Sequence, residues 1–251
     1  MTTDNPHILL LAGTHEARLL AKQLPERFPG VRLTASFAGV VKDLPELGIT
    51  TRVGGFGGTE GLAAFVRAEN VSAIVDATHP FAAQMSRNAS DVANQLGVPL
   101  IRLERPAWFA GPGDQWQAVS TIEEAAIALP AGARAFLAVG RKEVSAFYHR
   151  TDIYGLARMI EPPENPLPDG WSLLLSRPPQ DADEEVVLFE HHNISHVVTK
   201  NSGGTRAFAK IKAARRLQLP VIIIERPKLP NAETVAGVPE TLDRLANFVD
   251  N

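Results

Sequence analysis

Short apolar runs alternate with amphipathic segments along the first part of the chain. Five runs have the length and composition of buried β-strands: residues 7–12, 31–37, 51–55, 73–78 and 98–103. After the first run, four small or apolar residues share one helical face: Ala17, Leu20, Ala21 and Leu24. Strands that alternate with helices in this way predict a parallel sheet with helices on both of its faces.

The same alternation continues beyond residues 105–114, a stretch rich in proline and glycine that is typical of a linker. Further strands are predicted at residues 133–139, 152–158, 171–176, 195–199 and 220–225. Helices are predicted at residues 181–192, 205–217 and 239–249, and Thr121 with Glu124 predicts a capping box for another helix. We therefore predict an α/β protein of two domains, residues 1–107 and 108–251.

The amino-acid composition limits the classes of binding partner that we expect and leaves the fold prediction unchanged. The chain has 251 residues, a formal net charge of −3 and a sequence pI of about 6.2, whereas a nucleic-acid surface needs a basic excess. It contains no cysteine, which excludes disulfides and thiol catalysis and is compatible with a reducing cytoplasm. The first residues lack the pattern of a signal peptide, and the first apolar run is too short to span a bilayer. We expect a cytoplasmic protein with no membrane or nucleic-acid partner.

Candidate chemistry lies where the predicted strands end, because ligands of open parallel sheets bind beyond the carboxyl ends of the strands. Gly13 and Thr14 follow the first strand, where a glycine lets the backbone approach a phosphate. A single glycine is a poor match to G-x-G-x-x-G, so an ordinary turn is the alternative. The second strand ends at Ser36 and Phe37, without the carboxylate that binds the ribose of NAD, which favours NADP.

Two further strand ends concentrate glycine and polar residues. Residues 54–61 contain five glycines, which fit either a tight turn or the close approach of a ligand. Asp76 ends the fourth strand and His79 follows it, a pair that could hold a ribose or transfer a proton. The alternative is a helix start with polar caps, which accounts for Thr78 and Pro80 but not for His79.

Residues 199–204, T-K-N-S-G-G, place a cation, an amide, a hydroxyl and two glycines ahead of the helix predicted from Thr205. Such a segment predicts a site for phosphate or carboxylate, whereas a simple helix cap does not need Lys200. Other cations also stand at strand ends: Arg102, Arg105, Arg141, Lys142 and Arg226. If these ends converge, they form a basic pocket for a ligand with several negative charges.

Several other chemistries are disfavoured. His191, His192 and His196 do not share a helical face, and no carboxylate completes a metal set with them, so we predict no metal site. The Tyr-x-x-x-Lys pair of short-chain dehydrogenases is absent, as are G-x-S-x-G and G-x-x-x-x-G-K. A sugar-nucleotide reductase, which needs the tyrosine and lysine pair, is therefore a weaker alternative.

The motifs at these strand ends, taken in order, resemble the precorrin-6A and cobalt-precorrin-6A reductase family. They are G-T-H-E-A from Gly13, G-G-F-G-G from Gly54, D-A-T-H-P-F-A from Asp76, R-L-E-R-P-A-W from Arg102 and T-K-N-S-G-G from Thr199. Residues 210–215 and 225–227 fit as well, so the resemblance runs from about residue 7 to residue 227. The segments D-A-T-H-P-F-A and T-K-N-S-G-G are the most specific.

The resemblance implies two Rossmann-like domains with parallel sheets flanked by helices and a ligand cleft between them. It also implies an NADPH-dependent oxidoreductase that reduces one double bond of the precorrin-6A macrocycle, giving precorrin-6B in cobalamin biosynthesis. The substrate is then a tetrapyrrole polycarboxylate, which gives the cationic strand ends a purpose. The alternative from a different class is a non-catalytic tetrapyrrole- or nucleotide-binding module, which binds its ligand without oxidising NADPH.

Hypotheses for the site residues follow from these motifs. The cofactor is expected at Gly13, Thr14, Ser36, Ala38, Gly39, Gly55 and Thr78. The substrate is expected at His79, Arg105, Arg141, Lys200, Asn201, Ser202, Gly203 and Gly204, and His79 is also the candidate for proton transfer. The family often places an arginine directly after the Ala-Gly that ends the second strand. Here that residue is Val40, and Lys42 or Arg52 could replace the arginine near a 2′-phosphate.

Overall fold

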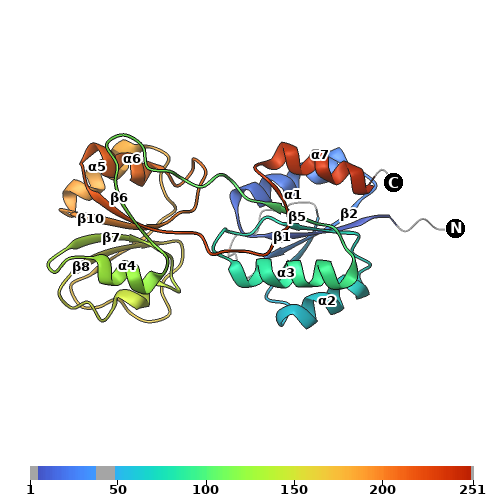
Figure 1. Cartoon of the computed structure of the whole chain (residues 1–251), viewed down its shortest axis with the longest axis horizontal. Coiled ribbons are helices and arrows are strands. Elements are labelled where there is room, and N and C mark those ends of the chain that lie inside the picture. Colours follow the sequence, from blue (N-terminus) through green and yellow to red (C-terminus); the bar gives the residue numbers. More distant parts are fainter. Residues whose placement is uncertain (1–4, 38–48, 250–251) are drawn as a thin grey trace. The chain divides into compact units, whose positions relative to one another are not determined.

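The computed structural model describes residues 5–37 and 49–249 and divides the chain into two compact units (Figure 1). Unit 1 combines the chain up to Arg105 with the chain from Lys228 onward, and unit 2 comprises Pro106–Pro227. The polypeptide therefore passes between the units at two places. Within the described residues, no helix is both long enough and apolar enough to cross a bilayer.

Unit 1 is built on a six-stranded parallel sheet with the order β12-β5-β4-β1-β2-β3. Its strands are β1 (His7–Ala12), β2 (Arg32–Phe37), β3 (Thr50–Val53), β4 (Ala73–Asp76), β5 (Leu100–Leu103) and β12 (Glu233–Val235). The strand order reverses between β1 and β4, since β2 and β3 extend the sheet on one side and β4 and β5 on the other. The carboxyl ends of β1 and β4 thus flank the crevice at which open α/β sheets bind ligands.

Helices cover both faces of this sheet, as the apolar pattern predicts. They are α1 (His15–Arg27) and α7 (Val238–Val249) on one face, and α2 (Gly58–Ala68) and α3 (Ala83–Leu96) on the other (Figure 1). In β1, Ile8 and Leu10 pack against the first pair of helices, whereas Leu9 and Leu11 pack against the second pair. Each of these four residues is at most 1% exposed. Burial from both sides explains why β1 is a continuous apolar run rather than an alternating one.

Unit 2 contains a second six-stranded parallel sheet, with the order β6-β11-β10-β7-β8-β9. Its strands are β6 (Gln115–Val119), β7 (Arg134–Ala138), β8 (Tyr154–Met159), β9 (Ser172–Leu175), β10 (His196–Lys200) and β11 (Pro220–Ile224). Its helices are α4 (Ile122–Ala128), the short 3₁₀ helix η1 (Val144–Phe147), α5 (Ala182–His191) and α6 (Ala209–Arg216). Phe189 of α5 and Ile211 of α6 enter one apolar core with Phe136 of β7. The predicted two-domain α/β fold with parallel sheets is therefore confirmed.

The two sheets have the same internal order, and each takes its sixth strand from elsewhere in the chain. Unit 1 runs β3-β2-β1-β4-β5, and unit 2 runs β9-β8-β7-β10-β11. β6 follows β5 along the chain but pairs with β11 in unit 2, whereas β12 follows β11 but pairs with β5 in unit 1. Each unit is thus completed by the strand that follows the fifth strand of the other unit.

This exchange changes the domain boundaries. The sequence predicts one domain from residue 108 to the end of the chain, but the structure places the chain from Lys228 onward in unit 1. β12 pairs with β5, and Val238 and Leu245 of α7 enter the same apolar core as α1. Because β12 is a three-residue strand, E-T-V, it has no apolar periodicity that could have revealed its partner.

A cluster of buried charged side chains lies in unit 2. Glu185 of α5 is fully buried and pairs with Arg158 of β8, which is 8% exposed. Lys210 of α6 is 4% exposed, donates a hydrogen bond from Nζ to the Ala207 carbonyl at 2.6 Å, and lies 5.0 Å from the ring centroid of Trp108. Burial lowers the pKa of Lys210 to about 8, and Glu185 opposes that shift. Two buried cations therefore share the carboxylate of Glu185.

Candidate functional site

Thr14 joins the carboxyl ends of β1 and β4 in unit 1. Its Oγ1 donates a hydrogen bond to the Ala77 carbonyl at 2.8 Å and accepts one from the Ala17 N–H at 3.1 Å, which caps α1. Thr14 is 8% exposed. Its hydroxyl is therefore committed to holding the crevice together. The groups of this turn that can face a phosphate are the backbone N–H groups at the start of α1.

The glycines that follow β1 and β3 differ in the structural reason for which glycine is needed. A Cβ added at Gly13 meets nothing within 4 Å, so the space in front of this residue is open. Gly54 has a φ of +109°, which glycine adopts most easily, and a Cβ at Gly61 would lie 1.7 Å from the Phe56 carbonyl oxygen. Gly55 has no positive φ, and a Cβ there meets nothing within 4 Å. Neither backbone conformation nor packing explains this glycine.

Ser36 is the next-to-last residue of β2 and is 5% exposed. Its hydroxyl accepts a hydrogen bond from Nη1 of Arg52 at 3.2 Å, and the two residues are partners in the parallel register of β2 and β3. The structure therefore places a cation at the end of β2, next to a predicted cofactor residue. Four residues named in the sequence predictions lie outside the described residues: Ala38, Gly39, Val40 and Lys42.

Asp76 ends β4 and organises the turn that follows. It is 1% exposed, and its Oδ1 accepts hydrogen bonds from the Thr78 N–H at 3.2 Å and from the Thr78 hydroxyl at 2.6 Å. Its Oδ2 lies 3.6 Å from Nε of Arg102. The Thr78 hydroxyl is thus committed to Asp76. Nδ1 of His79 accepts a hydrogen bond from the Phe81 N–H at 3.3 Å, so a neutral His79 carries its proton on Nε2.

His79 borders a small cavity of about 10 Å³, whose lining includes Asp76, Ser86, Arg102 and Glu104. This volume is about that of one water molecule. Arg102 is 6% exposed and donates from Nη1 to the Pro230 carbonyl at 2.9 Å. Within the described residues, its Nε and Nη2 and the Oδ2 of Asp76 make no hydrogen bond.

Besides Arg102, which lies beside Asp76, three more of the cations predicted at the strand ends have a carboxylate partner within their own unit. The pairs are Lys200 with Glu143 at 2.7 Å, Arg141 with Glu161 at 2.8 Å, and Arg105 with Glu16 at 3.0 Å. The prediction counted the cations at the strand ends but not the acidic residues of neighbouring segments. The Lys200 and Glu143 pair also joins the end of β10 to the turn after β7, where the strand order of unit 2 reverses.

Asn201 holds the segment with which unit 2 begins. Its Oδ1 accepts a hydrogen bond from the Trp108 N–H at 2.8 Å, and its Nδ2 donates to the Trp108 carbonyl at 3.0 Å. The indole N–H of Trp108 donates to the Gly204 carbonyl at 2.6 Å, and the Gly204 N–H donates to the Pro106 carbonyl at 3.3 Å. Two residues predicted to bind substrate, Asn201 and Gly204, therefore have a structural role that the sequence did not reveal.

Gly203 lies between Asn201 and Gly204, and we call residues 201–204, which hold Pro106 and Trp108, the clamp. It has a φ of +68°, and a Cβ there would lie 2.1 Å from Nη2 of Arg226 and 2.3 Å from the Pro106 carbonyl oxygen. The neighbouring Ser202 donates its N–H to the Lys200 carbonyl at 2.7 Å. The following helix, α6, begins at Ala209 and not at Thr205 as predicted. Residues 199–204 thus do not lie directly at the start of a helix, and the helix dipole adds little to an anion site there.

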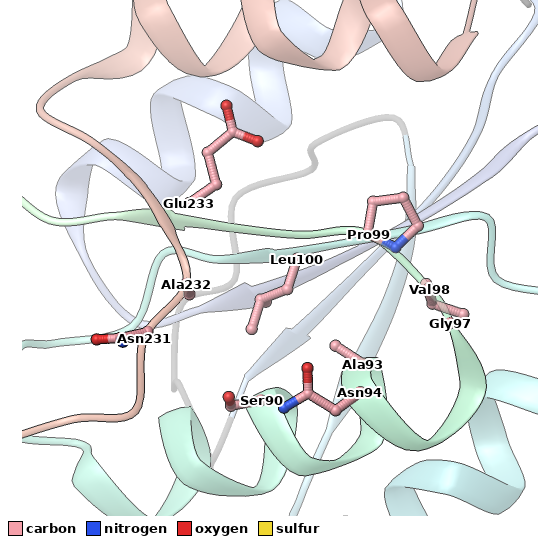
Figure 2. Close-up of a pocket in the computed structure, with 10 residues that line it drawn as sticks. All are labelled: Ser90, Ala93, Asn94, Gly97, Val98, Pro99, Leu100, Asn231, Ala232 and Glu233. Atoms are coloured by element: carbon pink, nitrogen blue, oxygen red, sulfur yellow. The ribbon is translucent and has the colours of Figure 1, made fainter.

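A larger cavity, of about 430 Å³, lies elsewhere in unit 1 (Figure 2). The last turn of α3, the amino end of β5 and the start of β12 border it, and Ser90 and Asn94 of α3 point toward it. Its charged lining residue, Glu233, lies 3.2 Å from Arg244. Because this cavity is at the amino end of β5, it is separate from the crevice at which such sheets bind ligands.

Known proteins match this chain over its whole length. A family model described as precorrin-6x reductase CbiJ/CobK matches residues 7–246. The precorrin-6A reductase of Rhodococcus erythropolis is 49% identical over an alignment of 244 positions that covers 96% of this chain and 95% of the relative. That of Sinorhizobium sp is 44% identical over an alignment of 251 positions that covers 98% of this chain and 95% of the relative.

A solved structure described as CobK precorrin-6A reductase is similar in fold, with a TM-score of 0.89, 41% sequence identity and 97% of each chain covered. A relative named for the cobalt-bearing substrate is more distant. The cobalt-precorrin-6A reductase of Priestia megaterium is 31% identical over an alignment of 253 positions that covers 96% of this chain and 98% of the relative. The similarity therefore spans both units.

Proposed function

Because this chain belongs to the precorrin-6x reductase family and thus reduces precorrin-6A in cobalamin biosynthesis, we propose that its hydride donor is NADPH, bound by unit 1. A nicotinamide cofactor supplies a hydride when bound, and a proton completes the reduction of one ring double bond to give precorrin-6B. The observation that carries this function is the full-length match to the precorrin-6A reductases, which includes both units. We also propose a cytoplasmic location, to which the absence of cysteine is suited.

The residues at the crevice of unit 1 suit a dinucleotide. The open space in front of Gly13 leaves room for a pyrophosphate beside the first N–H groups of α1. Glu16, in the first turn of that helix, would repel a phosphate, but Arg105 neutralises it at 3.0 Å. We therefore propose that Arg105 makes this helix start acceptable to the cofactor, in addition to its proposed contact with substrate. Gly55 and Thr78 complete the proposed cofactor site.

We still propose that residues of unit 2 bind the substrate, but the ion pairs of Arg141 and Lys200 change how they would bind it. Arg141 and Lys200 already have carboxylate partners, at 2.8 and 2.7 Å. A substrate carboxylate that binds either cation must therefore exchange with Glu161 or Glu143 rather than neutralise a bare charge. We propose that the clamp made by residues 201–204 holds Lys200 in place for this exchange.

We expect His79→Ala to lower kcat by about 10²-fold, because the Nε2–H of His79 is proposed to deliver the proton to the macrocycle. The imidazole sits beside the small cavity with Asp76 and Arg102, so a water molecule can return the proton between turnovers. Steady-state NADPH oxidation in excess macrocycle measures kcat. Full turnover in His79→Ala would remove His79 from the mechanism, and an unchanged affinity for NADPH is the control.

Alanine at Gly203 should affect the stability of unit 2, whereas alanine at Gly55 should affect cofactor binding. We expect Gly203→Ala to destabilise unit 2 by about 2 kcal/mol, because a positive φ and two close contacts both oppose a Cβ. Gly55→Ala should change the stability by less than about 0.5 kcal/mol and instead raise the Michaelis constant for the cofactor. Urea unfolding and steady-state kinetics measure the two effects. Unchanged cofactor kinetics in Gly55→Ala contradict its place in the cofactor site.

One assay tests the proposed function. Purified protein, precorrin-6A and NADPH are mixed, and the loss of the NADPH absorbance band is followed together with the change in the macrocycle spectrum. Parallel reactions contain NADH, or the cobalt-bearing macrocycle. We expect NADPH and the cobalt-free macrocycle to react fastest, because the relatives with 49% and 44% identity are named for precorrin-6A. Tight binding of the macrocycle without oxidation of NADPH would instead indicate a binding module.

A further inference from the structure

Arg52 differs from the other arginines near the strand ends of unit 1, because no carboxylate among the described residues pairs with it. Arg102 lies 3.6 Å from Asp76, and Arg105 lies 3.0 Å from Glu16. The guanidinium of Arg52, in contrast, donates only to neutral oxygens, which belong to Ser36, Gly54 and Gly55. An arginine keeps its charge under all physiological conditions. Unit 1 therefore holds a half-buried positive charge that these contacts leave uncompensated.

The surrounding residues hold this guanidinium in one position. Its Cζ lies 3.8 Å from the ring centroid of Phe56, and Phe56 in turn packs edge to face against Phe65 of α2, with centroids 5.2 Å apart. Nη1 donates to the Gly54 carbonyl at 2.7 Å, and Nη2 donates to the Gly55 carbonyl at 2.8 Å. A side chain that is fixed in advance loses little conformational entropy when an anion binds.

The hydrogen bonds that Arg52 makes leave two adjacent N–H donors of its guanidinium for a ligand. Arginine has five N–H groups, and both hydrogens of Nη1 are used by Ser36 and Gly54. With one Nη2 hydrogen donated to Gly55, the Nε–H and the second Nη2 hydrogen are not bonded to any described residue. Elsewhere in this chain, Nε and Nη2 are the atoms with which Arg150 grips the carboxylate of Asp152. The same pair of donors fits two oxygens of a phosphate.

The position of Arg52 selects the kind of anion. In this fold the ribose of the adenosine half lies beyond the end of the second strand, where an acid binds the 2′-hydroxyl of NAD or an arginine accommodates the 2′-phosphate of NADP. Arg52 is the register partner of Ser36 at the end of β2, and β2 ends in Ser36 and Phe37 without an acid. The Ser36 hydroxyl, already in contact with the guanidinium, can donate its own hydrogen to the same phosphate.

We infer that Arg52, together with Ser36, binds the 2′-phosphate of the cofactor and makes this enzyme prefer NADPH to NADH. This inference rests on the proposed function, since it needs a nicotinamide dinucleotide in unit 1.

The test compares two fragments that differ by one phosphate, 2′,5′-ADP and 5′-AMP, whose binding is measured by isothermal titration calorimetry. Wild-type protein should bind 2′,5′-ADP about 100-fold more tightly than 5′-AMP, and Arg52→Gln should lose most of that difference. Its affinity for 5′-AMP should not change. Arg67→Gln is the control, because Arg67 is an exposed arginine in the last turn of α2 and its loss changes the net charge equally.

A second variant keeps the test decisive if Arg52→Gln folds poorly. Arg52→Lys retains the charge but not the paired donors, so it should bind 2′,5′-ADP about tenfold more weakly than wild type. The ratio of kcat/KM for NADPH to that for NADH should fall in the same order across the three proteins. Preference for 2′,5′-ADP that survives in both variants overturns the role of Arg52 alone. Equal binding of the two fragments by wild type overturns NADPH as the proposed cofactor.

Discussion

Glu185→Gln should lower the free energy of unfolding of unit 2 by about 3–5 kcal/mol at pH 7, the usual cost of removing one partner of a buried ion pair. Glu185 is fully buried, and it is the carboxylate that faces both Arg158 and Lys210. Glutamine has nearly the same shape but no charge. The variant therefore leaves two cations in the interior without their shared counter-charge, and little of the effect comes from altered packing.

Urea unfolding followed by tryptophan fluorescence measures the free energy of unfolding of unit 2. The three tryptophans of the chain, Trp108, Trp116 and Trp171, all lie in unit 2. Glu184→Gln is a matched control, since Glu184 is the exposed neighbour on the same helix. Its stability should stay within about 0.5 kcal/mol of wild type. Similar losses in both variants would show that the buried ion pair contributes nothing special.

The stability of the wild-type protein relative to Lys210→Met should increase by about 3 kcal/mol as the pH rises from 8 to 10.5. Burial lowers the pKa of Lys210 from 10.5 to about 8 in the folded chain. Below pH 8 the lysine is protonated in both states, so the folded state bears the whole cost of the buried charge. Between these pKa values the unfolded chain binds more protons than the folded chain, and stability rises with pH. Above 10.5 no cost remains.

The measurement is the difference between the unfolding free energies of wild type and Lys210→Met at several pH values, which cancels the titration of other groups. Lys212→Met provides the control, because Lys212 is exposed on the same helix, and its difference from wild type should stay flat. A flat difference for Lys210→Met as well would show that the folded chain hydrates this ammonium group. Combined with Glu185→Gln, the window should begin at a lower pH, since Glu185 raises the pKa of Lys210.

The elements that position the site could largely be predicted, because buried parallel strands are apolar runs bounded by glycine and polar residues. β1, β4 and β10 all lie where the pattern predicts them, and the cap at Thr121 accepts the Glu124 N–H at 3.1 Å as expected. The start of α6 was placed too early because residues 205–208 have helical composition but form turns. Composition alone does not separate these two conformations.

The partners of the site residues could not be predicted in the same way. Lys200 and Glu143 are far apart in the sequence, and so are Asn201 and Trp108. A lysine or an asparagine at a strand end has the same appearance in the sequence whether it faces a ligand or a carboxylate of its own unit. Arg52, which has no carboxylate partner among the described residues, has the same appearance in the sequence as the paired arginines.

From its amino-acid order alone, this protein is recognisable as an α/β reductase of the precorrin-6x family, since local apolar runs specify the strands and the motifs D-A-T-H-P-F-A and T-K-N-S-G-G are specific. The exchange of the sixth strands and the pairing of the strand-end cations with carboxylates depended on the three-dimensional arrangement. Both result from pairing between distant segments: β12 is too short to carry a pattern, and an ion pair exists only where folding brings two charges within a few ångströms.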